Sequence, residues 1–250
     1  MNQRRTLLVG AAAVVFAFAA APVADAGTAR PVVQVARAGC SWSPVDVAGG
    51  FQLHAVSAVS GSDVWAVGNA NAVHKPFAVH YDGSEWKAVP VPTKGAGAID
   101  LYDVDTISKT NAWAVGYYVD GHGHRRTLTE HWDGTKWKSV PSPNKGTEDN
   151  TLHGVAAVSA SQVWAVGYTE PTGGDRPLIE HWNGSSWSRF PPAGLGGIHH
   201  RLEDVAVISS HLAVAVGHTP SNAHVERFDG SSWKTEGEAA ASQVGSAELL

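Results

Sequence analysis

Three basic residues stand one repeat length apart in the chain: Lys75, Arg126 and Arg176. Each precedes a short apolar stretch, where a loop is expected to meet a strand. Guanidinium and ammonium groups bind carboxylates through charge-assisted hydrogen bonds, so three of them on one rim would bind an acidic ligand or a sugar acid. The alternative is that each charge is solvated and discourages edge pairing of the strand that it begins.

Four histidines form the second group that could do chemistry. His122 and His124 stand in one loop, and His199 and His200 are adjacent in another. Imidazole is a common ligand of transition metals. No carboxylate or cysteine accompanies these histidines at a defined spacing. We therefore predict polar loops, with no metal site and no cofactor.

Acidic residues in the same loops are the candidates for acid–base catalysis. Asp120, Glu170 and Asp175 could act as acid and base if folding brought two of them together. An isolated surface carboxylate is the simpler interpretation of each. We predict no catalytic residue, and an enzymatic function is the less favoured alternative.

These loops belong to a repeat of about 50 residues that occurs four times, a period typical of β-propeller blades. Each unit contains a Trp-Ala-Val-Gly block, found at 65–68, 113–116, 164–167 and, as Val-Ala-Val-Gly, at 214–217. Each unit also contains a later block with Asp-Gly or Asn-Gly and a final tryptophan, found at 80–86, 131–137, 181–187 and 227–233.

Each unit is expected to form four strands. The first begins at a leucine, found at Leu53, Leu101, Leu152 and Leu202. The Trp-Ala-Val-Gly strand is apolar on both faces, as in a strand packed between two sheets. Asp-Gly and Asn-Gly predict a type I′ hairpin turn. Prolines accompany the fourth strand, which we therefore expect at the outer edge of the blade.

Tryptophans are the predicted structural anchors of the repeat, because a buried indole contributes a large apolar area. Seven occupy repeat positions: Trp65, Trp86, Trp113, Trp137, Trp164, Trp187 and Trp233. The later block begins with a histidine in three units, at His80, His131 and His181. We predict that these histidines bond a neighbouring blade, and a sugar-binding histidine–aromatic pair is the alternative.

The two blocks resemble the repeats of the kelch and galactose-oxidase-central-domain group of β-propellers. They are most similar to secreted bacterial repeat proteins with V-W-A-V-G and H-W-[DN]-G-x-x-W motifs, over roughly residues 42–233. The resemblance implies an all-β propeller of four-stranded blades. Galactose-oxidase chemistry requires a cysteine linked to a tyrosine at a copper site, whereas Cys40 lies outside the complete units.

The first 26 residues have the pattern of a signal peptide. Arg4 and Arg5 precede an uncharged run at 7–21, and residues 24–26 fit a cleavage site. The run is shorter than the roughly 20 residues of a spanning helix, so we expect export without a membrane span. The predicted division is a signal peptide at 1–26, a linker at 27–38, the propeller at 39–235, and a tail or incomplete blade at 236–250.

The composition argues against nucleic acid as a partner. The 250 residues carry 18 basic and 23 acidic side chains, a net charge of −5. Phosphates instead require clustered Lys and Arg. An extracellular protein or a glycan remains as the expected partner. The single cysteine excludes an intrachain disulfide.

The repeated segments do not add up to a whole number of blades. Residues 39–44 resemble a fourth strand without the preceding three, so five such strands accompany four sets of the others. Three arrangements fit this count. The chain forms a closed four-blade ring with an extra strand, is a shortened longer propeller, or belongs to a homo-oligomer that completes an unfinished blade.

Loop lengths indicate the functional face. All length variation within the complete units falls between the second and third strands, and function on a rigid scaffold usually lies on variable loops. The candidate ligand-binding residues on this face are Lys75, Arg126, Arg176, His122, His124, Asp175, His199 and His200. We predict a secreted, non-catalytic binding propeller. A carbohydrate-binding lectin and an extracellular polysaccharide-active enzyme are the alternatives.

Overall fold

The computed structural model describes residues 51–70, 74–193 and 199–240, the last four of them by their backbone alone. The chain divides into two units, Met1–Val45 and Asp46–Leu250, and every described residue belongs to the second. The predicted signal peptide, the linker, Cys40 and the extra strand at 39–44 lie outside the described residues. The described part contains no helix that could cross a membrane.

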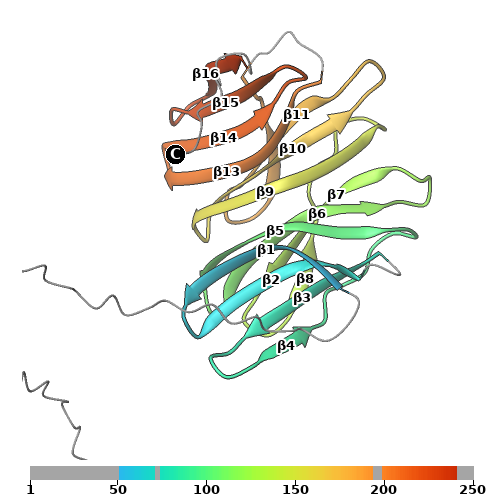
Figure 1. The fold of residues 1–250 in the computed structure, drawn as a ribbon, viewed down its shortest axis with the longest axis vertical. Helices are drawn as coiled ribbons and strands as arrows, with labels where there is room; N and C mark the ends of the chain where they lie inside the picture. The colour runs from blue at the N-terminus through green and yellow to red at the C-terminus, as the bar shows by residue number, and fades with distance from the viewer. Residues whose placement is uncertain (1–50, 71–73, 194–198, 241–250) are drawn as a thin grey trace, which may run out of the picture. The chain divides into compact units, whose positions relative to one another are not determined.

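Four antiparallel sheets, each of four strands in chain order, make up the described part (Figure 1). Blade 1 consists of β1 (Phe51–Ser60), β2 (Asp63–Ala70), β3 (Lys75–Tyr81) and β4 (Trp86–Val89). Blade 2 consists of β5 (Ile99–Ser108), β6 (Asn111–Val119), β7 (Arg125–Trp132) and β8 (Trp137–Val140). Blade 3 consists of β9 (Asp149–Ser159), β10 (Gln162–Glu170), β11 (Arg176–Trp182) and β12 (Trp187–Phe190). Blade 4 consists of β13 (Arg201–Ser209), β14 (Leu212–His218), β15 (Asn222–Phe228) and β16 (Trp233–Ala240). The predicted all-β fold of four-stranded blades is confirmed.

The turn before the fourth strand differs from the predicted type I′ turn. In blade 2 it spans residues 133–136, and φ is positive at Gly134 (+90°) but not at Asp133. The Asp133 carboxylate accepts the backbone N–H groups of Thr135 and Lys136 at 2.9 and 3.0 Å. The type I′ prediction is therefore wrong, because the aspartate side chain organises a four-residue turn with one left-handed residue. The same side-chain bonds occur at Asp82, Asn183 and Asp229.

Neighbouring blades pack on each other through two different faces. The leading face centres on the second strand, where Trp113 and Val115 of blade 2 point towards blade 3. The trailing face centres on the first strand, where Leu152 and Val155 of blade 3 point back towards blade 2. These four side chains share one buried cluster. Equivalent clusters join blade 1 to blade 2 and blade 3 to blade 4.

Six of the seven repeat tryptophans are buried, namely Trp65, Trp113, Trp137, Trp164, Trp187 and Trp233. The contact between Trp65 of blade 1 and Trp137 of blade 2 is typical: the rings meet edge-on with centroids 5.0 Å apart. Trp86 occupies the position of Trp137 in blade 1 and is only half-buried, since no earlier blade stands among the described residues. The tryptophans thus act as wedges between blades.

The four first strands follow one another as inner strands, in the order β1, β5, β9 and β13 (Figure 1). Polar side chains tie each inner strand to the next. The Thr106 N–H on β5 donates to the Ser57 hydroxyl on β1 at 3.1 Å. The Ala157 N–H on β9 donates to the Asp105 carboxylate on β5 at 2.7 Å. These bonds fix the position of one blade along the next.

The third strands of blades 2 to 4 each bury a glutamate completely: Glu130, Glu180 and Glu226. Glu226 accepts the N–H of Ala193, in the connection from blade 3, at 2.8 Å. Burial raises the pKa of Glu130 to about 7. Blade 1 has Val79 at this position. The buried glutamate therefore occurs only in blades 2 to 4, each of which follows another described blade in the chain.

Candidate functional site

The loops between the second and third strands meet the connections between blades, so both lie on one face. The Ile99 N–H, in the connection to blade 2, donates to the carbonyl of His74 in the loop of blade 1 at 2.7 Å. The His199 N–H, in the connection to blade 4, donates to the carbonyl of Asp175 in the loop of blade 3 at 3.0 Å. We call this the loop face.

The three predicted basic residues of the loop face have different surroundings. Lys75 begins β3 and is exposed. Arg126 lies 2.7 Å from the Asp120 carboxylate and donates to the Glu148 carbonyl at 3.2 Å, so it holds its own loop against the next connection. Of the three, only Arg176 lines the cavity beside blade 3.

The predicted histidines of blade 2 lie close to carboxylates. His124 Nδ1 is 3.4 Å from the Asp149 carboxylate. His122 is exposed, and its backbone N–H donates to Asp120 at 2.8 Å. Both contacts shape the loop that precedes β7.

The predicted histidines before blade 4 differ in burial. His199 is exposed and has a left-handed φ of 65°. His200 is buried, and its ring lies 5.7 Å from the ring of His224. Among the residues that the structure describes, no three His, Cys, Asp or Glu side chains are grouped to hold a metal ion.

Asp175 and Glu170 belong to an ion-pair network on the loop face. Arg201 lies 2.6 Å from Asp175 and 3.7 Å from Glu170. Arg125 lies 3.0 Å from Glu170 and 3.1 Å from Asp149. Each of these carboxylates therefore has a guanidinium partner that holds two blades together.

The repeat histidines bond within their own blades. His131 Nε2 lies 2.9 Å from Asn111 Oδ1 at the start of β6, and its ring packs 4.5 Å from that of Trp113. His80 and His181 make the same two contacts in blades 1 and 3. The prediction of bonds to a neighbouring blade is wrong, because the side chain is paired across the second and third strands.

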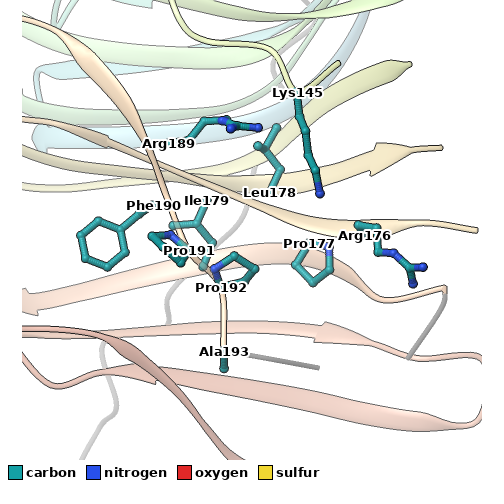
Figure 2. A pocket seen from close by; sticks show the side chains of 10 residues that line it. All are labelled: Lys145, Arg176, Pro177, Leu178, Ile179, Arg189, Phe190, Pro191, Pro192 and Ala193. Carbon is teal, nitrogen blue, oxygen red and sulfur yellow. The ribbon is translucent and has the colours of Figure 1, made fainter. Parts of the chain in front are cut away.

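A cavity of about 370 Å³ opens beside blade 3 (Figure 2). Ten residues line it: Lys145, Arg176, Pro177, Leu178, Ile179, Arg189, Phe190, Pro191, Pro192 and Ala193. Figure 2 shows Lys145 and Arg176 together at one end and the Phe190 ring at the other. The cavity therefore has a basic end and an apolar wall.

The local sequence explains the hollow. β12 ends at Phe190, because Pro191 and Pro192 cannot donate to a strand ladder and turn the chain away from the edge of the blade. The bond from the Ala193 N–H to the buried Glu226 carboxylate then anchors the departing chain in blade 4. The prolines are thus held as a fixed wall.

The charge of the lining is entirely positive. Lys145, Arg176 and Arg189 are its charged members, and none of the ten lining residues is Asp or Glu. Concave walls of low dielectric focus such a field, so the cavity attracts anions although the whole chain has a net charge of −5.

The repeat spacing identifies Arg176 but neither Lys145 nor Arg189 as a residue of this cavity. A signal for Lys145 exists, because Pro-x-Lys-Gly occurs at 92–95 and again at 143–146. Arg189 stands at a repeat position where blade 2 has Ser139, so the repeat gives no signal for it. The register of β11 and β12, which sets Arg189 opposite Glu180, brings it to the cavity.

No protein-family model matches the chain, and no curated protein matches it. Solved structures do. A six-bladed β-propeller lectin of Aleuria aurantia, which recognises fucose, is 14% identical, with a TM-score of 0.52 over 77% of this chain and 62% of the lectin. A thermostable family-43 glycoside hydrolase is 8% identical, with a TM-score of 0.47 over 77% of this chain and 73% of the hydrolase. A family 117 glycoside hydrolase from Zobellia galactanivorans is 9% identical, with a TM-score of 0.45 over 77% of this chain and 71% of the hydrolase.

The likeness to the lectin places the chain in the β-propeller class by fold. This chain spans 62% of the length of that lectin. The closer resemblance to kelch-type repeats remains a prediction from the sequence.

Proposed function

We propose that this chain is a secreted, non-catalytic binding protein that takes a carboxylate-bearing sugar into the cavity beside blade 3. One observation carries the proposal: Lys145, Arg176 and Arg189 all line one cavity, which has a proline and phenylalanine wall. Export is proposed from the signal-peptide pattern of residues 1–26.

The two parts of the cavity suit the two parts of a sugar acid. A guanidinium such as Arg189 offers a carboxylate two parallel N–H donors, which gives both strength and orientation. The Phe190 ring and the proline rings offer apolar surface to the C–H faces of a sugar ring. The volume of about 370 Å³ falls within the roughly 300–1,000 Å³ of small-molecule sites.

The fold is compatible with this function, since the Aleuria aurantia lectin is a propeller that recognises a sugar. A glycoside hydrolase usually needs two carboxyl groups about 5–9.5 Å apart around the bond that it cleaves. The ten residues that line the cavity supply cations and no carboxyl group. The cavity therefore supports binding rather than two-carboxylate hydrolysis.

A glycan array with matched acidic and neutral members tests the proposal. We expect the wild-type chain to retain uronic-acid glycans and not their neutral counterparts. Arg189→Gln should reduce that retention at least about tenfold, because it removes a charge-assisted bond. Lys109→Gln makes the same change of charge in an exposed turn and should leave retention unchanged. Equal retention of neutral members, or none of any glycan, would contradict the proposal.

A further inference from the structure

Blade 1 exposes the trailing face that the later blades bury. Leu53 is 41% exposed and Val56 is 67% exposed. The equivalent leucines of blades 2 to 4 are at most 1% exposed, at Leu101, Leu152 and Leu202. The equivalent valines are at most 5% exposed, at Val104, Val155 and Val205. An apolar face of β1 thus meets solvent.

Blade 4 exposes the opposite, leading face. Val216 on β14 is 43% exposed, whereas its equivalents Val67, Val115 and Val166 are completely buried. The leading face of every earlier blade packs on a trailing face. The two exposed faces are therefore the two halves of an interface that the chain already builds three times.

Hydrogen bonding at the inner strands also matches between these two faces. In blade 3, Gly154 stands where blade 2 has Asp103, and the Val155 N–H donates to Asp103 of that preceding blade at 2.7 Å. In blade 4, the Val205 N–H donates to Asp204 of its own blade at 2.7 Å. Blade 3, which has no aspartate at this position, thus uses the aspartate of the blade before it.

Blade 1 also lacks an aspartate here, because Ala55 precedes Val56. Blade 4 carries the matching Asp204, which is exposed. If blade 4 lay before blade 1 as blade 2 lies before blade 3, the Asp204 carboxylate would accept the Val56 N–H. This bond would be equivalent to the one between Asp103 and the Val155 N–H. At the same edge, the exposed His54 ring of blade 1 would approach the partly exposed Glu203 carboxylate of blade 4.

We infer that a second copy of this chain docks head to tail, with the leading face of blade 4 in one copy on the trailing face of blade 1 in the other. The interface continues the packing between blades, covering Leu53 and Val56 with Val216 and bonding Asp204 to the Val56 N–H. It joins two different faces, so it is a heterologous interface, which closes a ring or extends a row of copies. It does not involve the cavity beside blade 3.

Light scattering on the full-length chain, expressed and processed in its own host, tests this inference. We expect the wild-type chain to form dimers or larger assemblies. Val56→Lys spoils only the trailing face and Val216→Lys only the leading face, so each variant alone should be monomeric. A mixture of the two retains one intact pair of faces and should form a one-to-one heterodimer.

Two controls distinguish this interface from nonspecific association. Val158→Lys places the same charge on a 41%-exposed valine of blade 3 and should leave the assembly unchanged. Asp204→Asn should weaken association at least about fivefold without changing the unfolding temperature of the monomer. A monomeric wild-type chain would overturn the inference. It would mean that other residues of the same chain cover both faces. An assembly that survives either lysine variant, or a mixture that stays monomeric, would also overturn it.

Discussion

The Asp103 carboxylate on β5 accepts the backbone N–H of Val155 on β9 at 2.7 Å, which joins the inner strands of two blades. It also accepts the N–H of Val104 at 2.8 Å. Burial raises the pKa of Asp103 to about 7, against the lowering effect of these two bonds. The contact between blades 2 and 3 therefore contains a group that titrates near neutral pH.

Asp103→Asn should change how stability depends on pH. The pKa of Asp103 in the folded state lies above its ordinary 3.8, so the folded chain binds this proton more tightly. The stabilisation of the folded chain by protonated Asp103 is fully present below about pH 4 and is lost as the pH rises through about 7. Denaturant unfolding should show the wild type losing up to about 4 kcal/mol relative to the variant across this range. Glu85→Gln, an exposed control, should show no such trend. A stability gap that is the same at both ends of the range would refute the assignment.

Glu226→Leu should both destabilise the chain and weaken ligand binding. The substitution leaves the Ala193 N–H without its carboxylate acceptor, at a cost of about 1–3 kcal/mol. It also releases the proline wall of the cavity, so affinity for an acidic sugar should fall. Glu226→Gln retains an acceptor oxygen and should behave more like the wild type. Thermal unfolding and calorimetric titration measure the two effects, and unchanged affinity in the leucine variant would show that the wall does not depend on this bond.

Trp137→Ala and Trp86→Ala change the same repeat position in neighbouring blades. Trp137 is buried against Trp65, so its loss should cost about 3–5 kcal/mol of unfolding free energy. Trp86 is half-buried and should cost clearly less in the monomer. Both are measured by denaturant unfolding at low protein concentration. Equal costs would mean that packing between blades does not account for the burial of Trp137.

Gly134→Ala should weaken the turn between β7 and β8. The residue has φ of +90°, and an added Cβ would lie 2.8 Å from the Thr110 side chain. We expect a loss of about 1–3 kcal/mol. Gly121→Ala meets nothing within 4 Å and should change stability by no more than about 0.5 kcal/mol. Chemical denaturation compares the two, and an undiminished stability of the first variant would contradict the turn geometry.

The sequence is sufficient to predict the four blades because the same motifs recur in each of them. The Trp-Ala-Val-Gly strand predicts β2, β6, β10 and β14, and the prolines correctly predict an outer fourth strand. The turn type was mispredicted because Asp-Gly favours two left-handed residues only when the loop has two residues. Here the Asp133 side chain accepts the N–H groups of Thr135 and Lys136, which stabilises a longer turn.

The candidate site was only partly visible in the sequence. Arg176 was found because it recurs at a strand start, but its repeat counterpart Arg126 is held by Asp120 instead. The cavity depends on where β12 ends and on which residues a connection from another blade brings alongside. Lys145 and Arg189 are 44 positions apart, and only the packing of blade 3 on its preceding connection brings both to one cavity.

Calorimetric titration of the wild-type chain with a galacturonate oligosaccharide tests the central claim most directly. We predict saturable binding with one site per chain, weakened by added salt because the attraction is ionic. The double variant Lys145→Gln with Arg189→Gln should lose this binding, whereas Lys109→Gln should keep it. A wild-type chain that binds no galacturonate, or a double variant that binds it equally well, would contradict the assignment of the cavity beside blade 3 as the ligand site.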